Sequence, residues 1–249
     1  MAGHSHWAQI KRKKAAQDAK RGQLFTKLIR EIIVAVKTGG SGDPELNPRL
    51  RAAIQAARAA NMPKENIERA IKKALGLEEG TQYEEAFFEG YGPGGVAILI
   101  SAITDNRKRT VSELRHLFNK YGGNLAEPGA VSYLFEQKGL IVVPKKEEEK
   151  VLEIAIEKGA EDTKEYESEI EVITDPSQFE EIKKALEDAG VEIISAKVTM
   201  VPKTIVPVED EATANNLLKL MEALDDLDDV QQVYANFDIP ERIMEALNK

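Results

Sequence analysis

The sequence predicts a multidomain protein of the α and α+β classes: an N-terminal helical bundle, an α+β domain, and an inserted ferredoxin-like domain of βαββαβ order. Three observations support this prediction. Residues 1 to about 78 have the apolar periodicity of helices. Turns rich in glycine and proline, between β-like apolar segments, begin after that point. The order strand, helix, strand, strand, helix, strand is then readable over residues 140–201.

Three amphipathic helices are expected in the first part. From Lys20 onward, the apolar residues of 24–36 fall on one half of a helical wheel and the basic residues on the other. The glycine-rich run 39–44 ends that helix. A second helix is expected over about 48–60, and a third begins at Pro63, since proline suits the first turn of a helix.

The α+β domain is expected to begin with strands at 86–91 and 96–104. The glycines between them match G-x-G-x-x-G literally, but a strand follows and Pro93 lies inside, so we predict a strand-connecting turn rather than a dinucleotide site. A helix over about 110–121 follows, in which Thr110 and Glu113 form a capping-box pattern. The loop 122–129 is either a structural turn or an exposed recognition loop, and a strand at 131–135 is expected after it.

The inserted domain and the tail complete the order. Strands are expected at 140–143, 163–166, 169–174 and 191–201, with helices at 147–158 and 176–189. The tail has a helix at 210–224, a strand at 230–237 and a short helix at 241–248. We therefore divide the chain into 1–78, a discontinuous domain of 79–136 with 202–249, and an insert of 137–201, and we expect a monomer.

Charge is distributed unequally along the chain. The first 75 residues carry 16 of the 34 basic residues and only 6 of the 43 acidic ones. The remaining residues carry 18 basic and 37 acidic residues, so a cationic first third is attached to an anionic body. A concentrated positive field attracts polyanions, and the negative body confines their contact to one end. DNA or RNA, free or in a ribosome, is the expected partner.

The densest candidate site is the segment GHSHWAQIKRKK at residues 3–14. Its basic side chains, Lys11, Arg12, Lys13 and Lys14, would neutralise phosphates, and Trp7 among them could stack on a base. The alternative is a solvated arm without a fixed ligand. His4 and His6 could also bind Cu(II) or Ni(II) adventitiously, but we expect no functional metal site.

A second basic group lies within the acidic body. Arg107, Lys108 and Arg109 precede the expected helix at 110–121, where backbone N–H groups and three cations could hold a phosphate. A capped, solvated loop explains the same residues equally well. The acidic run Asp225, Asp226, Asp228 and Asp229 lacks the ligand spacing of a calcium loop and is expected to be a solvated loop.

Catalysis, cofactors and membranes find no support in the sequence. There is no cysteine, no nucleophile–base pairing and no P-loop. His116, the one histidine outside the N-terminal arm, is expected to be a surface or half-buried residue. The longest apolar stretch, 96–103, is far below membrane-spanning length. We expect a cytoplasmic, non-enzymatic protein with no cofactor and no small-molecule substrate.

Five long stretches of the chain are distinctive: AGHSHWAQIKRKKAAQDAKRGQLFTKLIREI, NPRLRAAIQAARAANMPKENIERAIKKA, FEGYGPGGVAILI with TDNRKRT, GGNLAEPGAVSYLFEQKG and LDDVQQVYANFDIPE. In these stretches the chain resembles the YebC family of presumed transcriptional regulators, which includes a mitochondrial translational activator. The resemblance implies three domains of the kind predicted above. Ala126 and Ala130 depart from the Gly and Ser that we expect of the family in the loop.

The resemblance implies a DNA-binding transcriptional regulator acting through the basic helical domain. The alternative is a ribosome-associated translation factor that binds ribosomal RNA and relieves stalling at proline-rich stretches. Both functions require a polyanion at the basic end. In addition to the arm residues above and Arg107 to Arg109, the expected contacts are Lys20, Arg21, Lys27, Arg58, Lys64, Arg69, Lys72 and Lys73.

Overall fold

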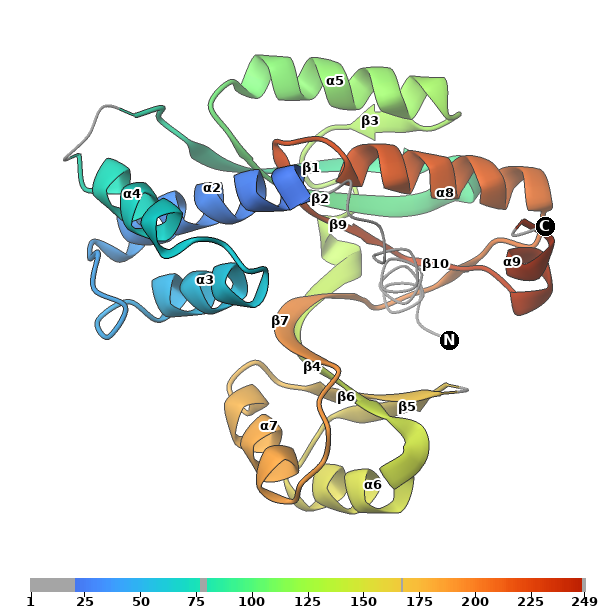
Figure 1. Cartoon of the computed structure of the whole chain (residues 1–249). Coiled ribbons are helices and arrows are strands. Elements are labelled where there is room, and N and C mark those ends of the chain that lie inside the picture. The colour runs from blue at the N-terminus through green and yellow to red at the C-terminus, as the bar shows by residue number, and fades with distance from the viewer. Residues whose placement is uncertain (1–20, 77–79, 167, 248–249) are drawn as a thin grey trace.

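Three helices form the first unit of the computed structural model, which describes residues 21–76, 80–166 and 168–247 (Figure 1). They are α2 (Arg21–Gly39), α3 (Pro48–Ala59) and α4 (Lys64–Ala74). Their facing sides bury an apolar core because each helix has one apolar stripe. This core includes Ile32, Ile33, Val36, Leu50, Ile54, Met62 and Ile67.

Asn47 is a buried residue that joins α2 to α3. Its side-chain oxygen accepts a hydrogen bond from the Leu50 N–H and caps α3, and its Nδ2 donates to the carbonyl oxygens of Ala35 (2.8 Å) and Ser41 (3.0 Å). Gly39 is required beside it, since a Cβ there would lie 2.3 Å from the Asn47 amide nitrogen. One side chain thus satisfies three backbone groups.

Replacing Asn47 with alanine is expected to lower the free energy of unfolding of the bundle by about 2 kcal/mol, because a helix cap and two buried hydrogen bonds are removed. Urea denaturation followed by circular dichroism measures this change. Asn66, which lies on α4 and has no side-chain hydrogen bond described, provides the matched control and should change stability by less than about 0.5 kcal/mol when replaced by alanine.

The central unit is an antiparallel sheet of order β3-β1-β2-β9, covered on one face by helices. Phe88, Ile98 and Ile100 point to that face and pack against Leu114 and Leu217 of the covering helices. The elements are β1 (Glu84–Gly92), β2 (Val96–Thr104), α5 (Arg107–Lys120), β3 (Asn124–Ala126), α8 (Glu211–Asp225), β9 (Val230–Ala235) and α9 (Glu241–Leu247). A short parallel pair, β8 (Val206–Pro207) with β10 (Phe237–Asp238), lies beside this sheet.

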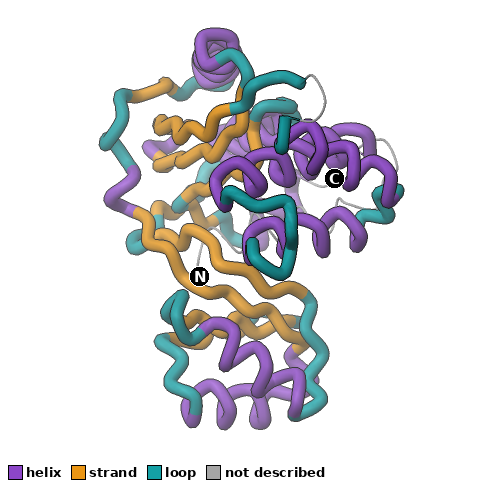
Figure 2. The backbone as a smooth tube through the Cα atoms, turned by 90° about the vertical axis from the view of Figure 1, so that its left-hand side faces the viewer, coloured by secondary structure: helices purple, strands orange, loops and turns teal. Residues whose placement is uncertain are grey.

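The third unit is a four-stranded antiparallel sheet of order β5-β6-β4-β7 with two helices on one face (Figure 2). Its elements are β4 (Phe135–Pro144), α6 (Glu148–Glu157), β5 (Asp162–Glu165), β6 (Glu169–Thr174), α7 (Phe179–Asp188) and β7 (Ser195–Pro202). Chain order and strand order are those of a ferredoxin-like βαββαβ unit. The predicted fold class is therefore confirmed.

Two strands carry the chain into this third unit and out of it. β4 and β7 pair from Phe135 opposite Pro202 to Val142 opposite Ser195. The predicted strand at 131–135 is wrong: Ser132–Leu134 form a 3₁₀ turn, and one continuous strand follows from Phe135. The boundaries that we propose at residues 137 and 201 consequently fall within a paired ladder.

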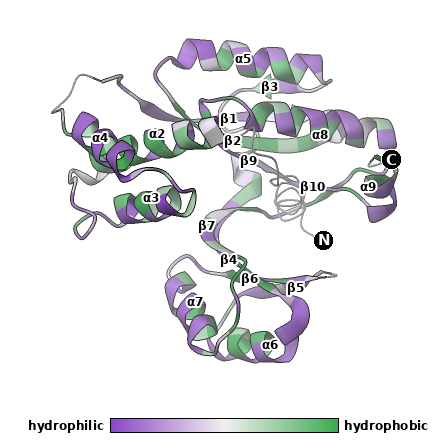
Figure 3. Ribbon diagram, viewed as in Figure 1, coloured by the Kyte–Doolittle hydropathy of each residue, from purple (hydrophilic) through white to green (hydrophobic). Residues whose placement is uncertain are grey.

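The start of α5 also differs from the prediction. The helix begins at Arg107, and Asn106 is its cap, accepting a hydrogen bond from the Arg109 N–H. The expected capping box at Thr110 and Glu113 is wrong because Thr110 is buried inside the helix and its hydroxyl bonds elsewhere. The prediction of a strand-connecting turn after β1 is confirmed, with Gly94 and Gly95 at positive φ. Figure 3 shows hydrophilic residues along most of α5.

Candidate nucleic-acid interface

Eight of the predicted contacts lie outside the described residues. They are His4, His6, Trp7, Lys11, Arg12, Lys13, Lys14 and Lys20. Arg21 is the first residue of α2. The structural description of the candidate interface therefore begins on the three helices of the bundle.

Four predicted contacts are exposed on α3 and α4. Arg58 lies in the last turn of α3, and Arg69, Lys72 and Lys73 lie along the outer side of α4. Within the described residues none of these four side chains has an ion pair. Lys64 is exposed as well and lies 3.5 Å from Glu68 one turn away, a pairing that is weak at the surface. The helix geometry thus presents these cations to solvent, where phosphates could reach them.

Lys27 is half-buried and reaches toward the central unit. Its Nζ donates a hydrogen bond to the carbonyl oxygen of Asp225, and Gln23 Nε2 donates to that of Asp226 at 3.1 Å. Both acceptors lie at the C-terminal end of α8, where carbonyl groups lack helical partners and the helix dipole attracts a cation. Lys27 therefore joins α2 to α8, and its contact with a polyanion stays a prediction.

A buried carboxylate also joins the bundle to the central unit, where α2 meets the C-terminal end of α8. We call this contact the seam. Asp229 is 3% exposed and accepts hydrogen bonds from the guanidinium groups of Arg30 and Arg109 and from the hydroxyls of Thr110 (2.7 Å) and Thr104 (3.2 Å). Burial favours the neutral acid, but these donors outweigh it, so the pKa of Asp229 lies below its ordinary value. The prediction of a solvated acidic loop is wrong at this residue.

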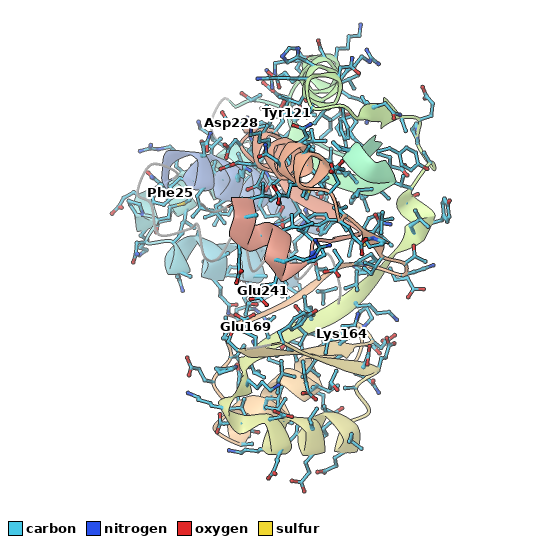
Figure 4. All side chains as sticks on the ribbon, turned by 90° about the vertical axis from the view of Figure 1, so that its right-hand side faces the viewer. Phe25, Tyr121, Lys164, Glu169, Asp228 and Glu241 are labelled. Carbon is cyan, nitrogen blue, oxygen red and sulfur yellow. The ribbon has the colours of Figure 1, made fainter. Side chains whose placement is uncertain are left out.

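Arg30 is the partner that the sequence pattern did not indicate. Its Nη1 also donates to the carbonyl oxygens of Ile103 (2.9 Å) and Asp228 (3.0 Å), and its guanidinium lies 5.1 Å from the centre of the Tyr83 ring. Figure 4 marks Asp228 between α2 and the end of α8. A single arginine within the apolar run of α2 was the signal available, but its partner lies 199 positions away.

The basic group at the start of α5 is divided by the fold. Arg109 forms ion pairs with Asp105 (2.6 Å) and Asp229 (3.0 Å), so its charge is compensated within the protein. Arg107 lies over the ring of Phe88, 5.3 Å from its centre, and Lys108 is exposed. Two of the three predicted cations therefore remain available to an anion.

The loop 122–129 is held in place by another buried carboxylate. Glu89 accepts hydrogen bonds from the backbone N–H groups of Gly129 (2.6 Å), Val131 (2.8 Å) and Ser132 (2.6 Å). Burial alone would raise the pKa of Glu89, but these three donors hold it below its ordinary value. Part of the loop also pairs with β1 as the short strand β3. The segment is thus well ordered by the sheet beneath it.

Other kinds of site find little in the part of the chain that is described. Among these residues no three His, Asp or Glu side chains are placed to hold a metal ion together. None of the described helices is both long and apolar enough to cross a membrane.

The fold and the exposed charges define a class: a multidomain α and α+β protein with a cationic helical bundle at one end. Two family models match the chain, one described as the TACO1/YebC protein N-terminal domain over residues 5–77, the other as the TACO1/YebC second and third domain over 83–237. The chain belongs to the TACO1/YebC family. The predicted family resemblance is confirmed.

Individual relatives are similar over the whole length. A probable transcriptional regulatory protein of Aquifex aeolicus is 59% identical, with 99% of this chain and all of the relative aligned. One of Thermotoga petrophila is 55% identical, covering 99% of this chain and 98% of the relative. A crystal structure titled as a conserved hypothetical protein from Aquifex aeolicus has a TM-score of 0.83 at 58% identity and covers 95% of this chain and 98% of that one.

Proposed function

We propose that the protein is a non-enzymatic, cytoplasmic regulator of transcription that binds DNA through its basic N-terminal helical domain. One observation carries the proposal: Arg58, Arg69, Lys72 and Lys73 are exposed on the bundle and have no ion pair among the described residues, although the body attached to them is strongly acidic. The names of the relatives, probable transcriptional regulatory proteins, support the same function.

The expected binding is mainly electrostatic. Cations on a helical surface gain affinity because phosphates release their counterions on binding. The logarithm of the binding constant should therefore fall linearly with the logarithm of the salt concentration. The central unit would orient the bundle, since Lys27 and Arg30 of α2 are bonded to Asp225 and Asp229 of that unit. Contacts of this kind position a protein on DNA but do not by themselves read its sequence.

Replacing Arg69, Lys72 and Lys73 together with alanine is expected to reduce the magnitude of the log–log salt slope by about 0.9 for each phosphate that the variant no longer neutralises. Fluorescence anisotropy with a labelled promoter fragment, repeated at several salt concentrations, measures the slope. Glu65 and Glu68 on the same helix supply a control: their replacement by glutamine should strengthen binding. A slope that is the same in wild type and the triple variant would refute binding by α4.

The proposal of transcriptional control needs a preference for sequence. Purified protein is expected to bind a promoter fragment more tightly than an unrelated duplex of equal length and composition. Equal binding to every duplex, combined with co-sedimentation with ribosomes, would replace this proposal with the translation factor considered above. Ribosome profiles of a deletion strain, with longer pauses at proline-rich stretches, would then be the expected finding.

A further inference from the structure

Helix α5 differs in charge from every other described helix of the acidic body. It carries five basic residues and one acidic residue, Glu113. The helices α6, α7, α8 and α9 each carry more acidic than basic residues. The positive charge of α5 is therefore a local feature in a body whose other helices carry the opposite sign.

The charges of α5 are sorted between its two sides. Arg109 and Glu113 line a surface cavity at the seam, shared with Asp228 and Arg30. Lys108, Arg115 and Lys120 are exposed, and so are the hydrogen-bonding side chains Ser112, His116 and Asn119. No ion pair of these six residues occurs within the described part of the chain. Near the start of α5 the charge on the seam side is thus compensated, whereas Lys108 and Arg115 carry uncompensated positive charge on the solvent side.

The cations of the first turn stand where they destabilise an isolated helix. A helix N-terminus favours negative charge, and cations there are unfavourable by roughly 0.3–1 kcal/mol each. In the acidic body, α6, α7, α8 and α9 each have an acidic residue in the first turn, whereas α5, like α2 and α3 of the bundle, has none. It begins with Arg107 and Lys108, followed by Arg109, whose charge Asp105 and Asp229 compensate. A bound anion would remove this penalty, since it would meet both the N-terminal N–H groups and the cations.

The cations at the two ends of α5, Arg107 and Lys120, are held in place before any ligand binds. The Arg107 guanidinium lies over the ring of Phe88, and the Lys120 ammonium lies 5.2 Å from the centre of the Tyr121 ring. Cation–π contacts restrict long side chains that are otherwise mobile, so binding costs less conformational entropy. From Lys108 to Lys120 the helix rises about 18 Å. That length of duplex axis carries about ten phosphates when both strands are counted.

The start of α5 lies next to the bundle. Asp229 binds Arg30 of α2 and Arg109 of α5, so the basic start of α5 lies at the seam with the bundle. In Figure 1, α5 runs along the outer edge of the molecule, and no described element lies beyond it. In the same view, the helices α6 and α7 of the insert lie at the opposite end of the molecule from α5, so a duplex on α5 would lie away from them.

We propose that the exposed face of α5, formed by Lys108, Ser112, Arg115, His116, Asn119 and Lys120, is a second binding surface for the phosphate backbone of the DNA bound by the bundle. The proposal rests on the proposed function and deepens it. It predicts a two-part interface in which α5 contacts only the phosphate backbone and both parts add to the salt dependence. The acidic residues Asp105 and Glu113 limit the contact to the solvent side of the helix.

The test replaces Lys108, Arg115 and Lys120 with alanine in the full chain and measures the salt slope for a DNA duplex of about 20 base pairs, two helical turns. The magnitude of the slope is expected to fall by about 2.7, or 0.9 for each phosphate neutralised by one of the three side chains. The matched control replaces Lys150, Lys184 and Lys219, exposed on α6, α7 and α8, with alanine. It removes the same net charge and should leave the slope unchanged.

The outcomes separate this inference from the proposed function. A slope reduced by the α4 variant but unaltered by the α5 variant overturns the inference and leaves the proposed function standing. Equal reductions from the α5 and control variants also overturn it, because net charge would then explain both. A wild-type protein that binds no duplex overturns the two proposals together. Acetylation of lysines with and without DNA gives a second readout: DNA should protect Lys108 and Lys120 but not Lys150 and Lys184.

Discussion

Replacing Asp229 with alanine is expected to lower the free energy of unfolding by about 3–5 kcal/mol, the largest effect of any single substitution considered for this protein. The change removes the acceptor of two guanidinium groups and two hydroxyls at a site that is almost fully buried. Arg30, itself 8% exposed, would be left as a buried charge without its carboxylate. Urea denaturation followed by circular dichroism measures the destabilisation.

A neighbouring residue provides the control for Asp229. Asp228 is exposed and contributes only its backbone carbonyl to Arg30, so replacing it with alanine should change stability by less than about 0.5 kcal/mol. Replacing Arg30 with methionine and Asp229 with leucine together should recover part of the stability, because no charge is then buried alone. A decrease below about 1 kcal/mol in the Asp229→Ala variant would show that water reaches the seam and solvates Arg30.

Replacing Glu89 with glutamine is expected to cost about 2–3 kcal/mol, because a carboxylate that accepts three backbone N–H bonds becomes an amide with one oxygen and its own donors. One or more of the N–H groups of Gly129, Val131 and Ser132 would be left without an acceptor. The loop should open locally, which hydrogen exchange at these three amides would detect. Glu127→Gln, an exposed change in the same loop, should leave both stability and exchange unaltered.

The contribution of Glu89 should depend on pH in one direction. Its pKa is lower in the folded protein than the ordinary value of 4.5, so its stabilisation is complete above that value and disappears as the pH falls through the folded pKa. The difference in unfolding free energy between wild type and Glu89→Gln should therefore be constant near pH 7 and shrink below about pH 4.5. A difference that stays constant down to about pH 3 would contradict the carboxylate's hydrogen bonds.

The elements that follow from local pattern were predictable from the sequence. The three helices of the bundle, the hairpin of β1 and β2, and the βαββαβ order depend on apolar periodicity and on turn residues near one another in the chain. The error at the start of α5 has a non-local cause. Asn106 and Thr110 are both suitable capping residues, and only the burial of Thr110 against Asp229 decides between them.

The seam between the bundle and the central sheet could not be predicted in this way. By pattern, Arg30 and Lys27 belong to a polar helix face. Their partners lie about 200 positions further along the chain, so the local pattern does not indicate them. The same seam removes Arg109 from the predicted phosphate site. Counting charges along the sequence shows that the N-terminal part has more basic than acidic residues. The count cannot separate exposed cations from those that join domains. Charge counting also does not indicate the exposed face of α5, because its basic residues are divided between an expected loop and an expected helix.

The ladder of β4 and β7 has a consequence for how this architecture can change over time. Phe135 and Pro202 are directly opposite each other, which in an antiparallel pair places their Cα atoms about 5 Å apart. A two-residue turn spans such a gap, so the whole segment between them could be excised or exchanged without moving the ends it joins. The molecule is in this sense modular, because the segment between these two residues can be replaced during evolution or by engineering.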